Sequence, residues 1–306
     1  MATIHGIFPA LPTPFDAKGQ VNTKVLRELI RFLLQAGVDG FYTTGGTGES
    51  MLLEPDERRK VLEATLEEVN GRVPVIAHIG DIATHVSADL AAHAASVGAD
   101  GVAAVPPPYF PIDLPALKAH YQAIADSAGD VPVWIYYIPS ATGSSISTES
   151  FQSLLEIEQI VGVKYTAINF YEMRNLIEMM DGRSFTIMSG ADDSCLLALT
   201  MGASGAIGTT YNFMAAHFVQ IYEAYQRGDI ASARELQFAA NRVIKALTSV
   251  PVIAGTKVIL RRMGFDCGLP RRPLRPLTPE EEMRLWSVLE STDFERIAGI
   301  TLQAKS

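Results

Sequence analysis

Two kinds of hydrophobic pattern alternate along the chain. Short runs rich in valine, isoleucine and aromatic residues are apolar at consecutive positions, as expected of parallel strands that are buried on both faces. Longer stretches between them carry apolar residues at positions i, i+3, i+4 and i+7, which is typical of amphipathic helices. The helical spacing is clear in two sets of residues: Leu26, Leu29, Ile30 and Leu33, and then Met173, Leu176, Ile177 and Met180.

Eight strand-and-helix units of this kind follow one another, and this repetition predicts an α/β fold, a (β/α)8 TIM barrel. The predicted strands are Gly6 to Ala10, Gly40 to Thr44, Val73 to His78, Gly101 to Val105, Val131 to Ile138, Ile160 to Tyr165, Ser184 to Met188 and Gly205 to Thr209. Helical patterns then continue over residues 213–228, 230–249, 251–263 and 279–291. We expect a barrel over residues 1–228, with its active site at the carboxyl ends of the strands, and a helical C-terminal extension over residues 229–306 that packs on it.

Composition and charge narrow the possible partners. Of 306 residues, 48% are apolar and 19% are charged, which is an ordinary globular composition. The net charge of −9 disfavours a nucleic-acid partner, because such a chain repels phosphate backbones. One basic group stands out, and we expect its members to be solvated or ion-paired: Arg261, Arg262, Arg271, Arg272 and Arg275.

Cysteine usage and hydropathy give no sign of secretion or of a membrane. Cys195 and Cys267 are not in a C-x-x-C pair, so neither a disulfide framework nor a zinc knuckle is indicated. The amino terminus lacks a basic segment before an apolar one, and no window reaches the length of a membrane span. We therefore expect a cytoplasmic protein without a membrane partner.

Lys164 is the most informative candidate for chemistry. It follows Ile160-Val161-Gly162-Val163, so an apolar strand carries its amine toward the mouth of the barrel, where loss of water favours the neutral form. A neutral amine can attack a carbonyl carbon and form a Schiff base. Tyr136, one strand away, could transfer protons in such a reaction. The alternatives are a lysine that extends to solvent from the strand end and an aromatic residue that only lines the barrel.

Two further strand ends carry polar groups. The loop Gly45-Gly46-Thr47-Gly48-Glu49 has Glu49 where a phosphate-binding P-loop needs lysine, so it is better suited to holding a small carboxylate through backbone N–H groups and Thr47. Asp192 and Asp193 follow the seventh strand and could bind a metal, cap the next helix or bind polyol hydroxyls. The six histidines show no compact metal-ligand spacing, and we expect no metal site.

Together these segments resemble the N-acetylneuraminate lyase and dihydrodipicolinate synthase family of class I aldolases over nearly the whole chain. Four motifs carry the resemblance: residues 45–49, Tyr136-Tyr137-Ile138-Pro139, Gly162-Val163-Lys164 and Gly205-Ala206-Ile207-Gly208. The resemblance implies that Lys164 forms the Schiff base, that Tyr136 transfers protons and that no cofactor is needed. It also implies that Gly46 and Thr47 bind the carboxylate of pyruvate, although the family usually has a hydroxyl residue at the position of Gly46.

The far end of the substrate distinguishes the branches of this family. The synthase branch usually has an arginine at the position of Ala141, so the resemblance favours the lyase branch. It implies that sugar hydroxyls are bound by Thr166, Gly190, Asp192, Asp193 and Thr209. Asp193 replaces a usual glutamate and Thr209 a usual serine. Phe110 replaces a tyrosine that completes a proton relay in many members, and adjacent Tyr109 is expected to point elsewhere.

The resemblance predicts an aldolase that cleaves N-acetylneuraminate, or a related 2-oxo-3-deoxy sugar acid, to pyruvate and a sugar aldehyde, which is N-acetylmannosamine for sialic acid. A homotetramer is expected from the same resemblance. Dehydration of a 2-oxo-3-deoxy sugar acid and a 2-keto-3-deoxygluconate-type aldolase are alternatives, as are 4-hydroxy-tetrahydrodipicolinate synthase and a non-catalytic 2-oxo acid sensor.

Overall fold

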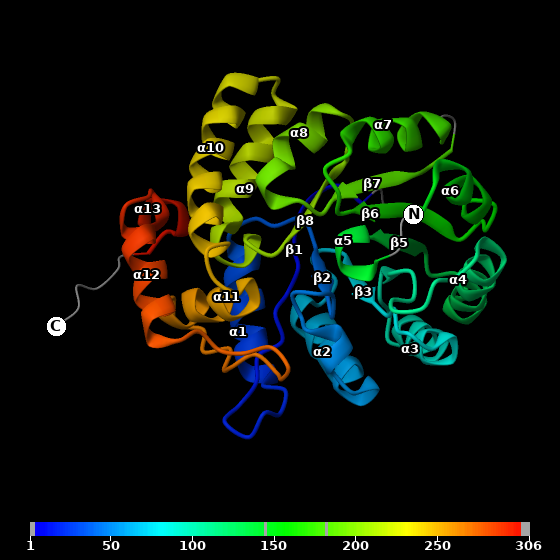
Figure 1. Ribbon diagram of the computed structural model, residues 1–306, viewed down its shortest axis with the longest axis horizontal. Helices are drawn as coiled ribbons and strands as arrows, with labels where there is room; N and C mark the ends of the chain where they lie inside the picture. The colour runs from blue at the N-terminus through cyan, green and yellow to red at the C-terminus, as the bar shows by residue number, and fades with distance from the viewer. Residues whose placement is uncertain (1–3, 144–145, 181–182, 301–306) are drawn as a thin grey trace.

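Eight parallel strands form a single sheet in the order β1-β8-β7-β6-β5-β4-β3-β2, which is the predicted (β/α)8 barrel (Figure 1). The structure is a computed structural model that describes residues 4–143, 146–180 and 183–300. The strands are β1 (Gly6–Pro9), β2 (Phe41–Thr43), β3 (Val75–His78), β4 (Gly101–Ala104), β5 (Val133–Tyr137), β6 (Ile160–Tyr165), β7 (Thr186–Ser189) and β8 (Gly205–Gly208).

The sheet closes into a barrel where the end of β1 meets β2. Ala10 and Tyr42 form a parallel bridge, and the N–H of Leu11 donates to the carbonyl of Tyr42 over 2.9 Å. All eight predicted strands are present, although most are shorter than predicted. Val73 and Val131 have strand-forming side chains, but strand pairing in β3 and β5 starts at Val75 and Val133. Side-chain type does not determine where a ladder begins, because pairing depends on the neighbouring strand.

Helices follow the strands around the barrel. They are α1 (Thr23–Gln35), η1 (Ser50–Leu52), α2 (Pro55–Val69), α3 (Thr84–Ser96), α4 (Leu114–Ala128), α5 (Pro139–Thr142), α6 (Thr148–Leu154), α7 (Phe170–Met179), η2 (Asp192–Ser194), α8 (Cys195–Thr200) and α9 (Tyr211–Gln226). The C-terminal helices are α10 (Ile230–Leu247), α11 (Val252–Arg262), α12 (Pro279–Glu290) and α13 (Phe294–Ala298). A capping box formed by Thr278 and Glu281 starts α12.

Two apolar layers lie on either side of the sheet. Along β5, Trp134 and Tyr136 belong to the cluster inside the barrel, whereas Val133, Ile135 and Tyr137 belong to the cluster between strands and helices. This alternation follows from the two-residue period of a strand. The inner cluster also contains Phe8, Tyr42, Ile76, Met188 and Ile207, so side chains fill the barrel below its mouth.

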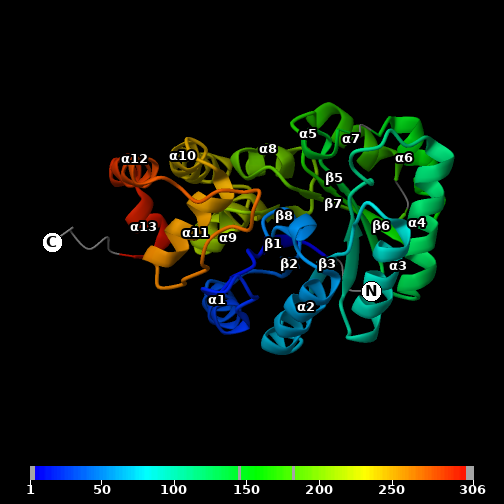
Figure 2. The same ribbon diagram turned by 60° about the horizontal axis from the view of Figure 1, so that its bottom comes forward.

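The C-terminal helices lie on one side of the barrel, next to α9 and far from α3 and α4 (Figures 1 and 2). Among the described residues, no single helix has the length and apolar character to cross a membrane. Only α10 and α11 together satisfy that test, and they are bent by 109°. Three arginines of the basic group form ion pairs, as expected: Arg261 with Glu282, Arg271 with Glu57 and Arg275 with Glu281. Both cysteines are buried and free.

Candidate active site

Lys164 lies inside the barrel and does not extend to solvent. It is 4% exposed, and in the strand register its neighbours are Tyr136 on β5 and Met188 on β7. Its Nζ lies 4.0 Å from the centroid of the Tyr42 ring and 4.1 Å from that of Tyr136. Burial lowers the pKa of Lys164 to about 7, and the carboxylate of Asp192 opposes this shift. A large fraction of the amine is therefore neutral near pH 7.

Tyr136 places a protonated phenol beside this amine. Burial raises the pKa of Tyr136 to about 12, the nearby Thr166 hydroxyl partly offsets this effect, and the charge of Asp192 adds to it. The phenol therefore keeps its proton at neutral pH and can donate it. Gly46 lies close to this hydroxyl, since a methyl group built on Gly46 would meet only the Tyr136 oxygen, at 4.0 Å.

In the loop of residues 44–49, Gly46 is exposed, and the other residues are buried. Its two ends, Thr44 and Glu49, both have the positive φ values that side chains other than glycine rarely adopt, 53° and 61°. Thr47 turns inward, and its hydroxyl lies 2.7 Å from that of Thr209, which follows β8, two strands away around the barrel. Glu49 forms an ion pair with Lys257, so its charge is neutralised within the protein.

Glycine is required beside Thr166. A methyl group on Gly190 would come within 1.8 Å of the Thr166 Oγ1 atom, so only glycine at this position lets the hydroxyl lie there. Gly208 does the same for Asp192, because its methyl group would lie 2.3 Å from the Asp192 Oδ1 atom. These two strand-end glycines leave space for the polar groups of the site.

Asp192 is fixed by Thr210, the N-cap residue of α9, which follows β8. Its Oδ2 atom accepts hydrogen bonds of 2.8 Å from both the backbone N–H and the hydroxyl of Thr210. Burial raises the pKa of Asp192 to about 6, which the Thr210 hydrogen bonds and the charge of Lys164 partly offset. Asp192 is only partly buried, and the charges of Asp192 and Lys164 each favour the charged form of the other.

The suggestion that Asp192 and Asp193 cap a helix is wrong. Both lie within the short helix η2, whose N-cap is Ala191, and the following helix α8 has Ser194 as its N-cap and no side-chain cap. Asp193 is exposed and accepts a hydrogen bond of 3.0 Å from the Ser194 hydroxyl. Within the described residues, no three His, Cys, Asp or Glu side chains are grouped so that they could hold a metal ion.

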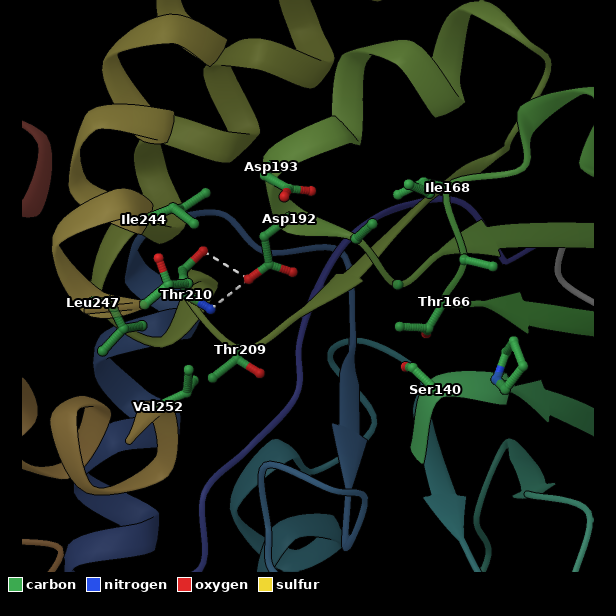
Figure 3. Close-up of a pocket in the computed structure, with 15 residues that line it drawn as sticks. Ser140, Thr166, Ile168, Asp192, Asp193, Thr209, Thr210, Ile244, Leu247 and Val252 are labelled. Carbon is green, nitrogen blue, oxygen red and sulfur yellow. Dashed lines mark hydrogen bonds between the residues drawn. The ribbon is translucent and has the colours of Figure 1, made fainter. Parts of the chain in front are cut away.

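A cavity of about 550 Å³ lies at the carboxyl ends of β5 to β8, and its described lining includes Thr166, two positions after Lys164, but not Lys164 itself. Figure 3 shows three groups of side chains around it. Ser140 and Thr166 lie on one side and Asp192, Asp193 and Thr209 lie across from them, whereas the apolar side chains on the remaining side come from α10 and α11. These apolar residues are Ile244, Leu247 and Val252. The structure therefore brings together all the predicted sugar-binding residues around one cavity: Thr166, Gly190, Asp192, Asp193 and Thr209.

Several residues of the site were not predicted from the sequence. Tyr42 is one of them, although its place in the middle of an apolar strand and two residues before Thr44 could have indicated that it faces inward. Thr210 and the apolar wall on α10 and α11 gave no comparable signal, because their roles depend on how distant segments pack. Tyr109 and Phe110 are 83% and 59% exposed, and their rings contact each other edge to face, 4.8 Å apart.

Comparison with known proteins agrees with this architecture. A sequence model of the dihydrodipicolinate synthetase family matches residues 3–292. The N-acetylneuraminate lyase of Rhizobium meliloti is 37% identical to the chain over 272 residues, which are 89% of this chain and 90% of that enzyme. Among solved structures, CdNal of Clostridium difficile, in complex with mannosamine, has a TM-score of 0.90 and 32% identity, covering 95% of this chain and all of that one.

The synthase branch is similar in structure to the same degree. Dihydrodipicolinate synthase DapA-2 of Bacillus anthracis has a TM-score of 0.90 and 33% identity, covering 95% of this chain and 99% of that one. The fold, the site and these relatives define an enzyme of the class I aldolase type, a carbon–carbon lyase. The chain belongs to the dihydrodipicolinate synthetase family.

Proposed function

We propose that this enzyme cleaves N-acetylneuraminate, or a closely related 2-oxo-3-deoxy sugar acid, to pyruvate and a sugar aldehyde through a Schiff base on Lys164. The observation that carries the proposal is the buried amine of Lys164, whose pKa falls to about 7 and whose Nζ lies between two tyrosine rings. A lysine in this environment is a nucleophile at neutral pH.

The mechanism needs only Lys164, Tyr136 and water. The neutral amine attacks the C2 carbonyl, and the resulting carbinolamine loses its hydroxyl as water when the Tyr136 phenol donates its proton. The phenolate then takes the proton of the C4 hydroxyl, the C3–C4 bond breaks, and its electron pair forms the enamine of pyruvate while the aldehyde departs. Tyr136 returns the proton to C3. Water then adds to the iminium, with Tyr136 taking its proton, and pyruvate leaves as the amine is regenerated.

The polar residues on opposite sides of the mouth would orient the substrate. Gly46 and Thr47 are proposed to hold the carboxylate of pyruvate. At the other end, the cavity carries two carboxylates, Asp192 and Asp193, and none of its described lining residues is a lysine or arginine. This charge favours a neutral polyol aldehyde over an aldehyde that bears a carboxylate, as the synthase reaction would require, since like charges repel. The mannosamine bound to the C. difficile relative supports the same choice.

A dehydratase is the second candidate, and the loop at Gly46 favours it. In that reaction the iminium of the whole sugar acid loses a proton from C3, and the enamine so formed expels the C4 hydroxyl, which takes up a proton and leaves as water, so the carbon chain stays intact. Gly46 has no hydroxyl group to offer beside Tyr136, and Phe110 is exposed, so the proton path at C4 differs from the pattern of the lyase branch. Product analysis separates the two, since pyruvate and an aldehyde arise only from cleavage.

Reductive trapping tests the Schiff base. We expect borohydride in the presence of pyruvate to add one three-carbon adduct to Lys164, located by peptide mapping, while exposed Lys24 stays unmodified. The Lys164→Ala variant should gain no adduct and release no pyruvate from N-acetylneuraminate. An unmodified Lys164 in the wild-type protein would disprove the mechanism. Binding of sugar acids without turnover would instead identify a 2-oxo acid sensor.

We also infer a homotetramer in the cytoplasm. Membership in the family supports the tetramer, and two buried free cysteines are compatible with a reducing compartment. Light scattering of the purified protein would measure the assembly directly. A monomer at micromolar concentration would contradict the expected state.

A further inference from the structure

A buried ion pair joins the loop of residues 44–49, which we propose holds the substrate carboxylate, to the C-terminal helices. The Nζ of Lys257 on α11 lies 2.6 Å from the Oε1 atom of Glu49, and the two side chains are 2% and 0% exposed. The other oxygen of Glu49 accepts a hydrogen bond of 2.6 Å from the backbone N–H of Arg271. Both contacts come from a segment more than 200 residues away in the sequence.

Lys257 is itself enclosed. Its Nζ lies 4.2 Å from the centroid of the Phe15 ring and 3.3 Å from the Leu269 carbonyl. Glu49 is its counterion, and a buried charge that loses its partner is strongly unfavourable. The side chain of Glu49 is therefore fixed on Lys257, and its backbone φ of 61° is held with it.

The other end of the loop is held from within the barrel. The Thr44 hydroxyl donates to the His78 carbonyl over 2.8 Å, and the His78 ring nitrogen Nδ1 lies 2.9 Å from the Thr44 carbonyl. Gly46 and Thr47 thus lie between two fixed ends, one attached to β3 and the other to α11. The positive φ values at Thr44 and Glu49 need such support from surrounding groups.

We propose that Lys257 is a positioning residue for the substrate carboxylate: through Glu49 it fixes the loop that presents the Gly46 and Thr47 groups to a 2-oxo acid. Lys257 does not touch the substrate. The proposal rests on the function proposed above and assigns to the C-terminal extension a part in binding, in addition to its contribution of the apolar wall. Removal of the ion pair should weaken recognition of the carboxylate and leave the reactivity of the Lys164 amine unchanged.

The test compares two ketones that form the same Schiff base, pyruvate and the uncharged hydroxyacetone, by the rate of borohydride trapping on Lys164. For Lys257→Met we expect the half-saturating concentration of pyruvate to rise about tenfold, which corresponds to about 1.4 kcal/mol. The value for hydroxyacetone should stay within about twofold. Equal losses for both ketones would indicate a general defect and overturn the proposal.

Two further variants keep the test decisive. The double variant Glu49→Gln with Lys257→Met removes both charges together, so no unpaired charge is buried, and it should keep a thermal midpoint close to that of the wild type. Its half-saturating concentration of pyruvate should still be higher than that of the wild type. Unchanged pyruvate saturation in this variant would overturn the proposal. Arg242→Met breaks an exposed ion pair with Asp293 in the same extension. It should change the half-saturating concentration of neither ketone. If the wild-type protein is trapped by neither ketone, the proposed function itself fails, and this inference fails with it.

Discussion

Lys164 and Tyr136 are direct partners in the register of two adjacent strands, and the Nζ atom lies 4.1 Å from the centroid of the phenol ring. The pairing matters because the same loss of water shifts the pKa values of the two groups in opposite directions. Burial lowers the pKa of the amine to about 7 and raises that of the phenol to about 12. Near pH 7 about half of the amine is therefore unprotonated and can act as the nucleophile, while the phenol keeps its proton and can act as the acid.

The phenol proton of Tyr136 should matter more than its ring. We expect Tyr136→Phe to lower turnover of the sugar acid by about 10²- to 10⁴-fold, the usual contribution of a positioned general acid or base. Packing against Lys164 is retained, so prolonged reductive trapping with pyruvate should still label the lysine, although more slowly, because Tyr136 also donates the proton that releases water from the carbinolamine. Steady-state release of pyruvate, measured beside the trapping yield, separates the two effects.

Tyr42 provides a matched control for that variant. Its ring lies at nearly the same distance from the Nζ atom, 4.0 Å, and in the described part of the chain its buried hydroxyl has no hydrogen-bond partner. Tyr42→Phe should therefore change turnover by no more than a few fold. A large loss of turnover with Tyr42→Phe and none with Tyr136→Phe would mean that Tyr42, and not Tyr136, transfers the proton.

The charge of Asp192 should shift the acid limb of the pH profile that Lys164 sets. Only the neutral amine attacks pyruvate, so trapping should be half-maximal near pH 7 and fall as the pH decreases below it. The Asp192 carboxylate favours the ammonium form, so Asp192→Asn should lower the pKa of Lys164 further and move the limb to lower pH. Initial trapping rates from pH 5 to 9 would show this. Exposed Asp193 is the control, and Asp193→Asn should leave the limb in place. A limb that moves to higher pH with Asp192→Asn would contradict the assignment.

Burial of Lys164 should lower the free energy of unfolding relative to a protein with an uncharged side chain at this position. Its pKa falls from 10.5 to about 7 on folding, so the unfolded chain binds the additional proton between these values and stability rises with pH. Replacement by methionine removes the penalty. At pH 7 Lys164→Met should gain a few kcal/mol, and its thermal midpoint should rise by about 5 °C or more.

The pH dependence of this gain is diagnostic. It should be complete below pH 7 and shrink as the pH rises toward 10.5, where lysine is neutral in both states. Calorimetry at several pH values would follow it. Lys24→Met, on the exposed surface of α1, should show no such gain. A destabilised Lys164→Met protein at pH 7 would mean that Lys164 is held as a well-compensated charge.

The barrel was predictable because its signals are local. Each strand has its own short apolar run, and the helices between have a separate period, so the order of elements could be read without knowledge of their contacts. Strand ends were less predictable, as Val73 and Val131 show, because pairing with a neighbour decides them. The predicted site depended on the rule that strand ends of a barrel meet at one face.

What the sequence did not reveal depends on contacts between distant segments. The role of Asp192 as the acceptor for Thr210 required β7 and β8 to be placed side by side. Glu49 could be recognised as a poor phosphate ligand, but its partner Lys257 lies more than 200 residues further along the chain. Nothing local marks that lysine as more than a member of an amphipathic helix.

Gly46 offers a gain-of-function test of the carboxylate site. Its backbone does not have a positive φ, and a methyl group there would meet only the Tyr136 oxygen, at 4.0 Å, so a serine fits without displacing its neighbours. The new hydroxyl would lie near the phenol, where it can donate to the carboxylate of pyruvate. A hydrogen bond of this kind contributes about 0.5 to 1.5 kcal/mol, so Gly46→Ser should lower the half-saturating pyruvate concentration by about two- to twelvefold. Gly46→Ala adds the carbon without the hydroxyl and should give no tighter binding than glycine. Equal saturation curves for the serine and alanine variants would place the carboxylate elsewhere than at this loop.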